Sequence, residues 1–318
     1  MVASATAVSG FEVPHHKGYR PLGQLIVATA VGLYFTPEAF QQTIDHFVSM
    51  VIAAVLTIGA GFRTAIVLYR LTKCDGTVAF FASMPGGPAE MAVLAERWGA
   101  PPAPVVLGQT LRIVFIVLLI PVGLALFAGL DVPVVRPAAA VDPVGLVMLY
   151  AIAAGGTVFL RRLKVPNCNF LGPLAVAALI SVSGLELSGV PKPLLAGGQV
   201  LLGISLGANF RREQFARDLK FSIALVATTV VLLVQCAAVA AGLWLVDSGP
   251  SLASYLLATA PGSVTEMALT AKLLGQRVAL VTAYHLVRIF IIIPLAPVLY
   301  RAFRRALSGR MTFDNLMD

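Results

Sequence analysis

The chain has 318 residues, of which 58% are hydrophobic and 12% are charged, about half of the roughly 25% charged content of soluble domains. Its 23 Lys and Arg outnumber its 15 Asp and Glu and give a net charge of +8. These basic residues stand between long apolar runs, where membrane proteins keep the charges that set their topology. The composition predicts an all-α polytopic membrane protein, and it argues against a soluble protein that binds nucleic acid.

Neither the N-terminus nor the cysteines add a constraint. The first ten residues are small and uncharged and lack the basic start and apolar centre of a signal peptide. The three cysteines form no CxxC pair, so we expect no disulfide framework, metal or haem. No cofactor is therefore expected.

Eight segments are candidate membrane spans, although several are shorter than the roughly 20 residues that a perpendicular helix needs. In chain order they are Leu22–Phe35, Phe47–Tyr69, Val105–Leu130, Val144–Phe159, Phe170–Ser183, Leu194–Leu206, Phe221–Val246 and Val278–Tyr300. Two further segments, Phe81–Gly99 and Leu257–Gly275, place a Pro-Gly pair between two short apolar stretches. This pattern is typical of a re-entrant hairpin or of an unwound crossing helix.

Two stretches of the sequence recur about 175 residues later. Six of 18 positions are identical between residues 23–40 and 198–215, and eight of 19 between residues 81–99 and 257–275. The matches include Gly, Pro and Glu, which a shared apolar composition does not explain. We infer a duplication into halves 1–130 and 131–318. Two apolar segments precede the repeat in the second half alone, so the first half is predicted to be shortened at its N-terminus.

The basic residues predict that the two halves are inverted. If both Pro-Gly segments are re-entrant, 16 of the 23 Lys and Arg fall on one side of the bilayer and four on the other, with Arg63, Arg112 and Arg288 at membrane depth. If the segments cross fully, the basic residues at 211–220 and 301–310 fall on opposite sides. The basic side should be cytoplasmic, so we predict a multi-pass protein of the inner (plasma) membrane.

A glutamate follows the Pro-Gly pair in each repeat, at Glu90 and Glu266. A half-helix that begins there points its free N–H groups and positive dipole end into the membrane, and intramembrane acids are costly unless paired or functional. Both glutamates are candidate sites for a coupling cation or a proton. The alternative is a capping box, because Ser263 precedes Glu266 by three residues and Gly87 has the same spacing from Glu90.

Other candidate binding residues flank the same two motifs. Ser83 and Thr259 offer hydroxyl groups just before the interruptions, although small polar residues more often serve helix packing. The unwound backbone itself is a candidate ligand at four positions, namely Pro85, Gly86, Pro261 and Gly262.

Two arginines, Arg112 and Arg288, lie in corresponding apolar segments. Their duplication favours a buried partner, either the nearby glutamate or an anionic substrate, over snorkelling to the membrane surface. Gln24 and Gln199 are corresponding positions of the repeat, as are Gln109 and His285; they are weaker candidates, because such side chains more often form interhelical hydrogen bonds than bind ligands. No metal site is expected, because His285 has no second ligand nearby in the sequence.

The repeated motif PGG-x-x-E-M in the first half, and A-P-G-S-V-T-E-M-A in the second, each followed by an embedded arginine, resemble the AbrB family of integral membrane proteins. Some members of this family carry the label ammonia monooxygenase. The resemblance covers about residues 23–305. It implies an inner-membrane protein with a regulatory association, and it supplies no catalytic residues.

Three functions are compatible with these residues. The first is a secondary transporter or exporter that works by alternating access around the two interrupted helices, with an unknown small molecule or ion as its substrate. The second is a membrane sensor that regulates gene expression without transport. The third, a membrane monooxygenase, lacks the clustered histidine or carboxylate ligands that a copper site needs. A homo-oligomer is compatible with all three.

Overall fold

The computed structural model describes residues 18–127, 141–165, 167–185, 187–207, 219–247 and 249–314. Over these ranges the chain forms thirteen α-helices and no strand, which confirms the all-α fold class. Five of the described helices have the length and apolar composition to cross a membrane. They are α4 (Phe47–Thr72), α7 (Pro102–Phe127), α8 (Pro143–Arg162), α12 (Leu219–Val246) and α15 (Val278–Asp314).

The other three predicted spans form shorter helices. These are α2 (Tyr19–Gly32), α9 (Cys168–Val182) and α10 (Lys192–Gly207), of 14, 15 and 16 residues. At 1.5 Å per residue they measure about 21 to 24 Å, less than the roughly 30 Å of a hydrocarbon core. Apolar composition alone did not separate these short helices from the long ones.

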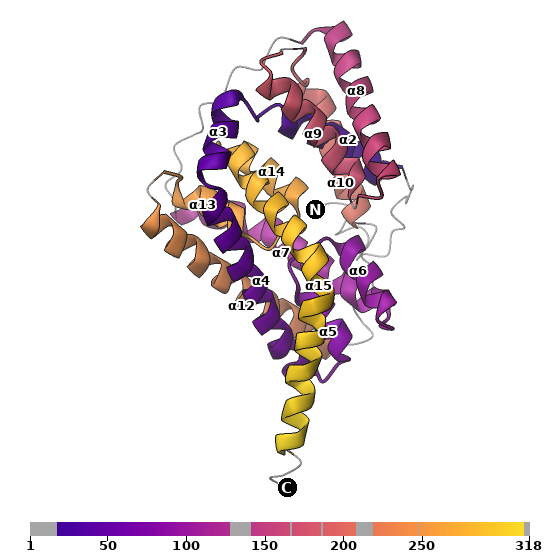
Figure 1. Ribbon diagram of the computed structural model, residues 1–318, viewed down its shortest axis with the longest axis vertical. Helices are drawn as coiled ribbons and strands as arrows, with labels where there is room; N and C mark the ends of the chain where they lie inside the picture. The colour runs from indigo at the N-terminus through magenta and orange to yellow at the C-terminus, as the bar shows by residue number, and fades with distance from the viewer. Residues whose placement is uncertain are drawn as a thin grey trace.

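The helices form two groups, and Figure 1 shows the first at the upper right and the second below it and to its left. The four-helix group consists of α2, α8, α9 and α10, which pack on one another. The hairpin group consists of α4, α7, α12 and α15 with four short helices, α5 (Gly76–Ser83), α6 (Pro88–Arg97), α13 (Leu252–Thr259) and α14 (Val264–Leu273). The amphipathic helix α3 (Pro37–Asp45) connects α2 in the first group with α4 in the second.

Helices α2 and α10 cross at two glycines that the sequence repeat pairs with each other. A Cβ atom on Gly23 would lie 2.8 Å from the Gly198 carbonyl oxygen and 2.9 Å from Leu202 Cγ, and a Cβ atom on Gly198 would lie 2.8 Å from Ile26 Cγ2. Only glycine allows the two backbones to approach so closely. Because the later residue on α2 contacts the earlier residue on α10, the two helices are antiparallel.

Contacts along α4 give the directions of its neighbours. Near its start, Ser49 Oγ lies 2.6 Å from Tyr284 OH of α15, and further along α4 the ring of Phe62 lies 5.6 Å from the ring of Phe303. Helix α15 therefore runs parallel to α4. Helix α12 runs antiparallel, because Gln235 reaches Thr64 at 3.4 Å while the end of α12 meets the start of α4. Corresponding helices α4 and α12 thus have opposite directions, which supports the prediction of an inverted repeat.

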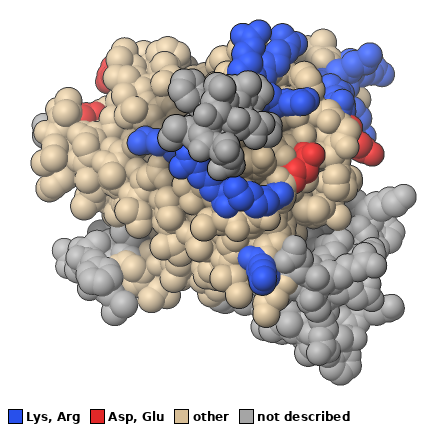
Figure 2. All heavy atoms as spheres, turned by 90° about the horizontal axis from the view of Figure 1, so that it is seen from below, with Lys and Arg blue, Asp and Glu red and all other residues tan. Residues whose placement is uncertain are grey.

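These directions bring basic helix ends to one end of the molecule. The C-terminal ends of α4 and α15 and the start of α12 carry the exposed residues Arg70, Lys73, Lys220, Arg301, Arg304 and Arg305. Figure 2 looks at this end and shows Lys and Arg gathered on it. Five basic residues of the predicted topology lie outside the described residues, namely Lys17, Arg136, Arg211, Arg212 and Arg217. The cytoplasmic assignment of this end stays a prediction.

Candidate functional site

The chain leaves the helical conformation at both Pro-Gly pairs. Helix α5 ends at Ser83 and α6 begins at Pro88, and α13 ends at Thr259 and α14 begins at Val264. The residue before each proline is extended, with ψ of 137° and 136°. Proline causes this, because it lacks the N–H that would continue the helix and disfavours helical ψ in the residue before it. Each segment is therefore two half-helices with a short extended link.

The second interrupted segment begins and ends at the same place. Arg277, which follows α14, donates a hydrogen bond of 2.9 Å to the Gly249 carbonyl, which precedes α13. Ser251 Oγ donates to Gln276 Oε1 at 2.6 Å across the same two ends. The segment α13–α14 is thus a hairpin, as a re-entrant element requires, and we refer to it as the second hairpin.

The first interrupted segment closes in the same way on α15. Thr77 Oγ1, at the start of α5, lies 2.7 Å from Tyr300 OH, and the ring of Trp98, just after α6, lies 4.8 Å from the ring of Tyr300. We refer to α5–α6 as the first hairpin. Tyr300 lies roughly six turns, about 33 Å, along α15 from Val278, which directly follows the second hairpin. The two hairpins therefore enter from opposite ends of α15.

A buried arginine holds the interruption of the first hairpin. Arg112 on α7 is 2% exposed. Its Nη1 donates to the carbonyls of Ser83 and Met84 at 3.2 and 3.0 Å, and its Nη2 donates to the Gly86 carbonyl at 3.2 Å. The Ser83 carbonyl is one of those that a helix leaves without partners at its C-terminal end, and the Met84 and Gly86 carbonyls lie in the link between the two half-helices. The guanidinium satisfies them and places a positive charge at the negative end of the α5 dipole.

Arg288 on α15 repeats these contacts at the second hairpin. It is 4% exposed and donates through Nη1 to the carbonyls of Thr259 and Ala260 at 3.4 and 2.8 Å, and through Nη2 to that of Gly262 at 3.0 Å. Both arginines are buried, as predicted, and do not snorkel. The partners that the structure gives them are backbone carbonyls at each interruption, and not the nearby glutamates. An anionic substrate as a further partner stays a prediction.

A side chain one turn before each arginine completes the arrangement. Gln109 donates from Nε2 to the carbonyls of Phe81 and Met84 at 2.7 and 2.9 Å, and its Oε1 accepts from Arg112. His285 contacts the Leu257 carbonyl through Nε2 at 2.9 Å, and its Nδ1 lies 2.7 Å from Arg288 Nη2. Because an arginine only donates, Nδ1 is the acceptor and the imidazole proton lies on Nε2.

The two interruptions share a small cavity at the boundary between the two helix groups. The cavity measures about 40 Å³ and is lined by Gly86 and Glu90 of the first hairpin, Gly262 and Ser263 of the second, and Gln24 of α2, together with Pro85, Arg20, Thr265 and Asn167. An adjoining cavity of about 30 Å³ is lined by Glu266 and shares Arg20, Gln24 and Ser263. The N-terminal ends of α6 and α14 thus face one region, which is typical of ion and substrate sites in transporters.

Each glutamate has one oxygen without a partner. Among the described residues, Oε2 of Glu90 and Oε2 of Glu266 are buried and accept no hydrogen bond. The capping-box interpretation is wrong for Ser263, whose side chain makes no capping hydrogen bond, and Gly87 has no side chain to form one. The two carboxylates therefore keep acceptor capacity next to the shared cavities.

Three predicted candidates, Thr259, Ser83 and Pro261, do not line these cavities. Thr259 Oγ1 lies 3.1 Å from the Cys236 carbonyl oxygen and 3.0 Å from that of Tyr255, and these are hydrogen-bond distances. Its hydroxyl therefore serves packing between α12 and α13. Ser83 is buried, and neither Ser83 nor Pro261 lines the two cavities. For Thr259 the geometry favours the helix-packing alternative over a binding role, and the role of the Ser83 hydroxyl stays a prediction.

Two residues at this site, Arg20 and Asn167, were not predicted from the sequence. Arg20, at the start of α2, lines both cavities, so it lies near both glutamates. Asn167 precedes α9 in a left-handed conformation with φ of 55° and accepts a hydrogen bond of 3.2 Å from Gln24 Nε2. Neither belongs to the repeat, so the sequence held no signal that would have placed them beside the Pro-Gly motifs.

No group of three or more His, Cys, Asp or Glu side chains within the described ranges could hold a metal ion. Arg63, the third arginine expected at membrane depth, is exposed on α4.

The fold and site are those of a helical protein with several apolar helices of membrane-spanning length. The chain belongs to the AbrB family, because the family model described as "Transition state regulatory protein AbrB" matches residues 1–304. It is 28% identical over 313 residues to the "Uncharacterized protein YhjN" of Bacillus subtilis (strain 168), with 91% of this chain and 80% of that protein covered. It is 27% identical over 240 residues to the "Putative regulator AbrB" of Escherichia coli (strain K12), with 74% and 68% covered.

Proposed function

We propose that this protein is a secondary transporter or exporter of the inner membrane. The observation that carries the proposal is the shared cavity, which two hairpins entering from opposite ends and the separate four-helix group line together. Rocking of one helix group against the other would open this cavity to one side of the membrane and then to the other. Its ligand is a small molecule or an ion.

The two glutamates are the proposed coupling sites. Each has a buried oxygen without a partner beside a half-helix N-terminus, and Arg20 lines the cavities of both. Binding of a proton or a cation would neutralise a carboxylate that is otherwise costly at this depth. Arg20 comes from the other helix group, so a change in the loading of the carboxylates would alter the attraction between the groups.

The test is solute-driven ion movement in proteoliposomes. Vesicles that contain a pH-sensitive dye are challenged with candidate solutes, with and without a sodium gradient, and a transported solute changes the internal pH or requires the gradient. We expect Glu90→Gln with Glu266→Gln to abolish the coupled signal while the protein still folds. Solute flux that stays coupled in this double variant would overturn the role of the carboxylates. The matched control is Glu96→Gln, because Glu96 is exposed on α6.

The alternative function is a membrane sensor that regulates expression. One observation favours it. The family description contains the word regulatory, and the name of one relative contains the word regulator. A sensor would bind a solute at the same cavity, and the solute would raise the unfolding temperature, but no flux would follow. Stabilisation by a solute that never crosses the vesicle membrane would therefore favour the sensor.

A further inference from the structure

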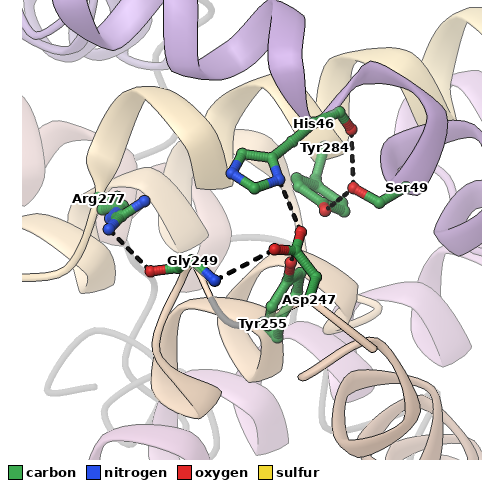
Figure 3. Close-up of polar contacts among 7 residues, drawn as sticks. All are labelled: His46, Ser49, Asp247, Gly249, Tyr255, Arg277 and Tyr284. Carbon is green, nitrogen blue, oxygen red and sulfur yellow. Dashed lines mark hydrogen bonds and ion pairs between the residues drawn. The ribbon is translucent and has the colours of Figure 1, made fainter. Parts of the chain in front are cut away.

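The outer end of the second hairpin carries a polar cluster that the proposed transport site does not use (Figure 3). Its centre is Asp247, which follows α12. Asp247 Oδ2 lies 2.7 Å from His46 Nδ1 and accepts a hydrogen bond of 2.5 Å from Tyr255 OH, and Oδ1 accepts one of 3.1 Å from the Gly249 N–H. One carboxylate thus joins the corner between α3 and α4 to the first half-helix of the second hairpin.

Two further contacts extend the cluster to α15. Ser49 Oγ donates to the His46 carbonyl at 2.7 Å, and Tyr284 OH lies 2.6 Å from the same Ser49 oxygen. Arg277 donates to the Gly249 carbonyl at 2.9 Å. The cluster therefore connects α4, α13 and α15 at this end, and a movement that carries α13 together with Asp247 away from the corner between α3 and α4 must break the contact between His46 and Asp247.

Solvent reaches the pair. The side chain of His46 is 16% exposed and that of Asp247 is 28% exposed. An open cleft of about 440 Å³ lies beside the pair and is lined by Gly249, Ser251 and Arg277. Protons can therefore exchange with the imidazole without a change in the fold.

The first hairpin has a different closure. Its outer end is held by aromatic packing of Phe80 and Trp98 around Tyr300 and by the bond between Thr77 and Tyr300. The acid at that end, Asp75, caps α5 through the Thr77 N–H at 2.6 Å. Over the described residues, an ion pair between a histidine and a carboxylate occurs only at the second hairpin.

We propose that His46 and Asp247 form a proton-controlled latch that holds the outer end of the second hairpin shut when His46 is protonated. Histidine changes charge between about pH 5 and 8, and a charge-assisted hydrogen bond is roughly twice as strong as a neutral one. The other groups that face the pair are Tyr255, Tyr284 and, through Gly249, Arg277. Tyrosine and arginine ordinarily titrate near pH 10 and above, so His46 is the member of the cluster that switches.

The neighbouring acid on the same corner does not compete for His46. Asp45 accepts a hydrogen bond of 3.0 Å from Gln41 within α3. The latch is independent of the proposed transport, because it concerns only the opening of the hairpin, and its test needs no substrate.

The test measures the opening of the hairpin through a buried reporter thiol. Ala258, in the second turn of α13, is 4% exposed and does not line the open cleft, and Ala258→Cys is made in a background in which Cys74, Cys168 and Cys236 are replaced by Ala. The rate of maleimide labelling of the purified protein is divided by the rate at the exposed control Ser183→Cys, which removes the pH dependence of the reagent. We expect this relative rate to rise about fivefold between about pH 5.5 and pH 8.

Two variants of His46 separate charge from shape. His46→Gln should label at the fast rate at both pH values, and His46→Lys, which keeps a fixed positive charge, should label slowly at both. Asp75→Asn at the first hairpin should leave the pH response unchanged. A relative rate that does not change with pH in the parent, a pH response that persists in His46→Gln, or a His46→Lys variant as fast as His46→Gln would each overturn the latch.

Discussion

Arg112 and Arg288 each bind three backbone carbonyls at an interrupted helix, and each is almost completely buried. A charge in this position is tolerated because oriented carbonyls replace the water that it loses. The pairing also explains why an arginine recurs at the same register of both repeats. Lysine would not substitute, because it cannot spread its donors over three carbonyls in a plane.

Replacing either arginine should therefore destabilise the protein. Arg288→Lys leaves at least one buried carbonyl without a donor, which costs about 1 to 3 kcal/mol, and Arg288→Met should cost more because all three lose theirs. Thermal unfolding in detergent measures this. Arg63→Gln on the exposed face of α4 is the control and should change stability by no more than about 0.5 kcal/mol. Equal unfolding temperatures for Arg288→Met and the wild type would show that the guanidinium does not hold the interruption.

The sequence could predict which residues flank the interruptions but not what they bind. Repetition singled out the arginines and the glutamates, because a matched register survives in the sequence. Their partners did not follow, because backbone carbonyls have no sequence signature. The pair of His46 and Asp247 was equally hidden, since 201 positions separate its members and no repeat marks either of them.

The crossing of α2 and α10 depends on two small residues. A methyl group at Gly23 would lie 2.8 Å from the Gly198 carbonyl oxygen, so Gly23→Ala must push the helices apart and should cost about 1 to 3 kcal/mol. Gly59 on α4 is the matched control, because a Cβ atom there meets nothing within 4 Å. Gly59→Ala should stabilise by up to about 1 kcal/mol through helix propensity. Unfolding temperatures that rank the two variants in the reverse order would contradict the crossing.

The end of α12 should make stability depend on pH in a defined direction. Partial burial alone would raise the pKa of Asp247, but hydrogen bonds from Tyr255 and the Gly249 N–H, together with the charge of His46, hold this pKa below its usual value. A lowered pKa in the folded state stabilises the protein above the unfolded pKa of about 3.9, and this stabilisation is lost as the pH falls through the folded value.

We therefore expect Asp247→Asn to lower the unfolding temperature clearly at about pH 6 and much less at about pH 3, where the wild-type carboxyl is also protonated. Asp45→Asn is the control, since Asp45 is exposed and accepts a hydrogen bond from Gln41 within its own helix. A difference between wild type and Asp247→Asn that grows as the pH falls would contradict the assigned direction.

The overall organisation was partly readable from the sequence. Apolar segments located the helices, and the Pro-Gly pairs located the two interruptions, because both features are local. The grouping of α2 with α8, α9 and α10 was not readable, since it depends on close approaches such as Gly23 against Gly198 and Gly156 against Gly172. Such approaches depend on which helices meet, and single glycines in apolar helices do not reveal it.

Opening of the shared cavity to both sides of the membrane can be measured without a known substrate. Ser263 lines both parts of the cavity and its side chain caps no helix, so Ser263→Cys in a background without other cysteines reports access directly. A membrane-impermeant maleimide is applied to oriented vesicles from the outside in one experiment and from the inside in another, with Ser183→Cys as a one-sided control. Alternating access predicts labelling of Ser263→Cys from both sides, and labelling from one side alone would contradict it.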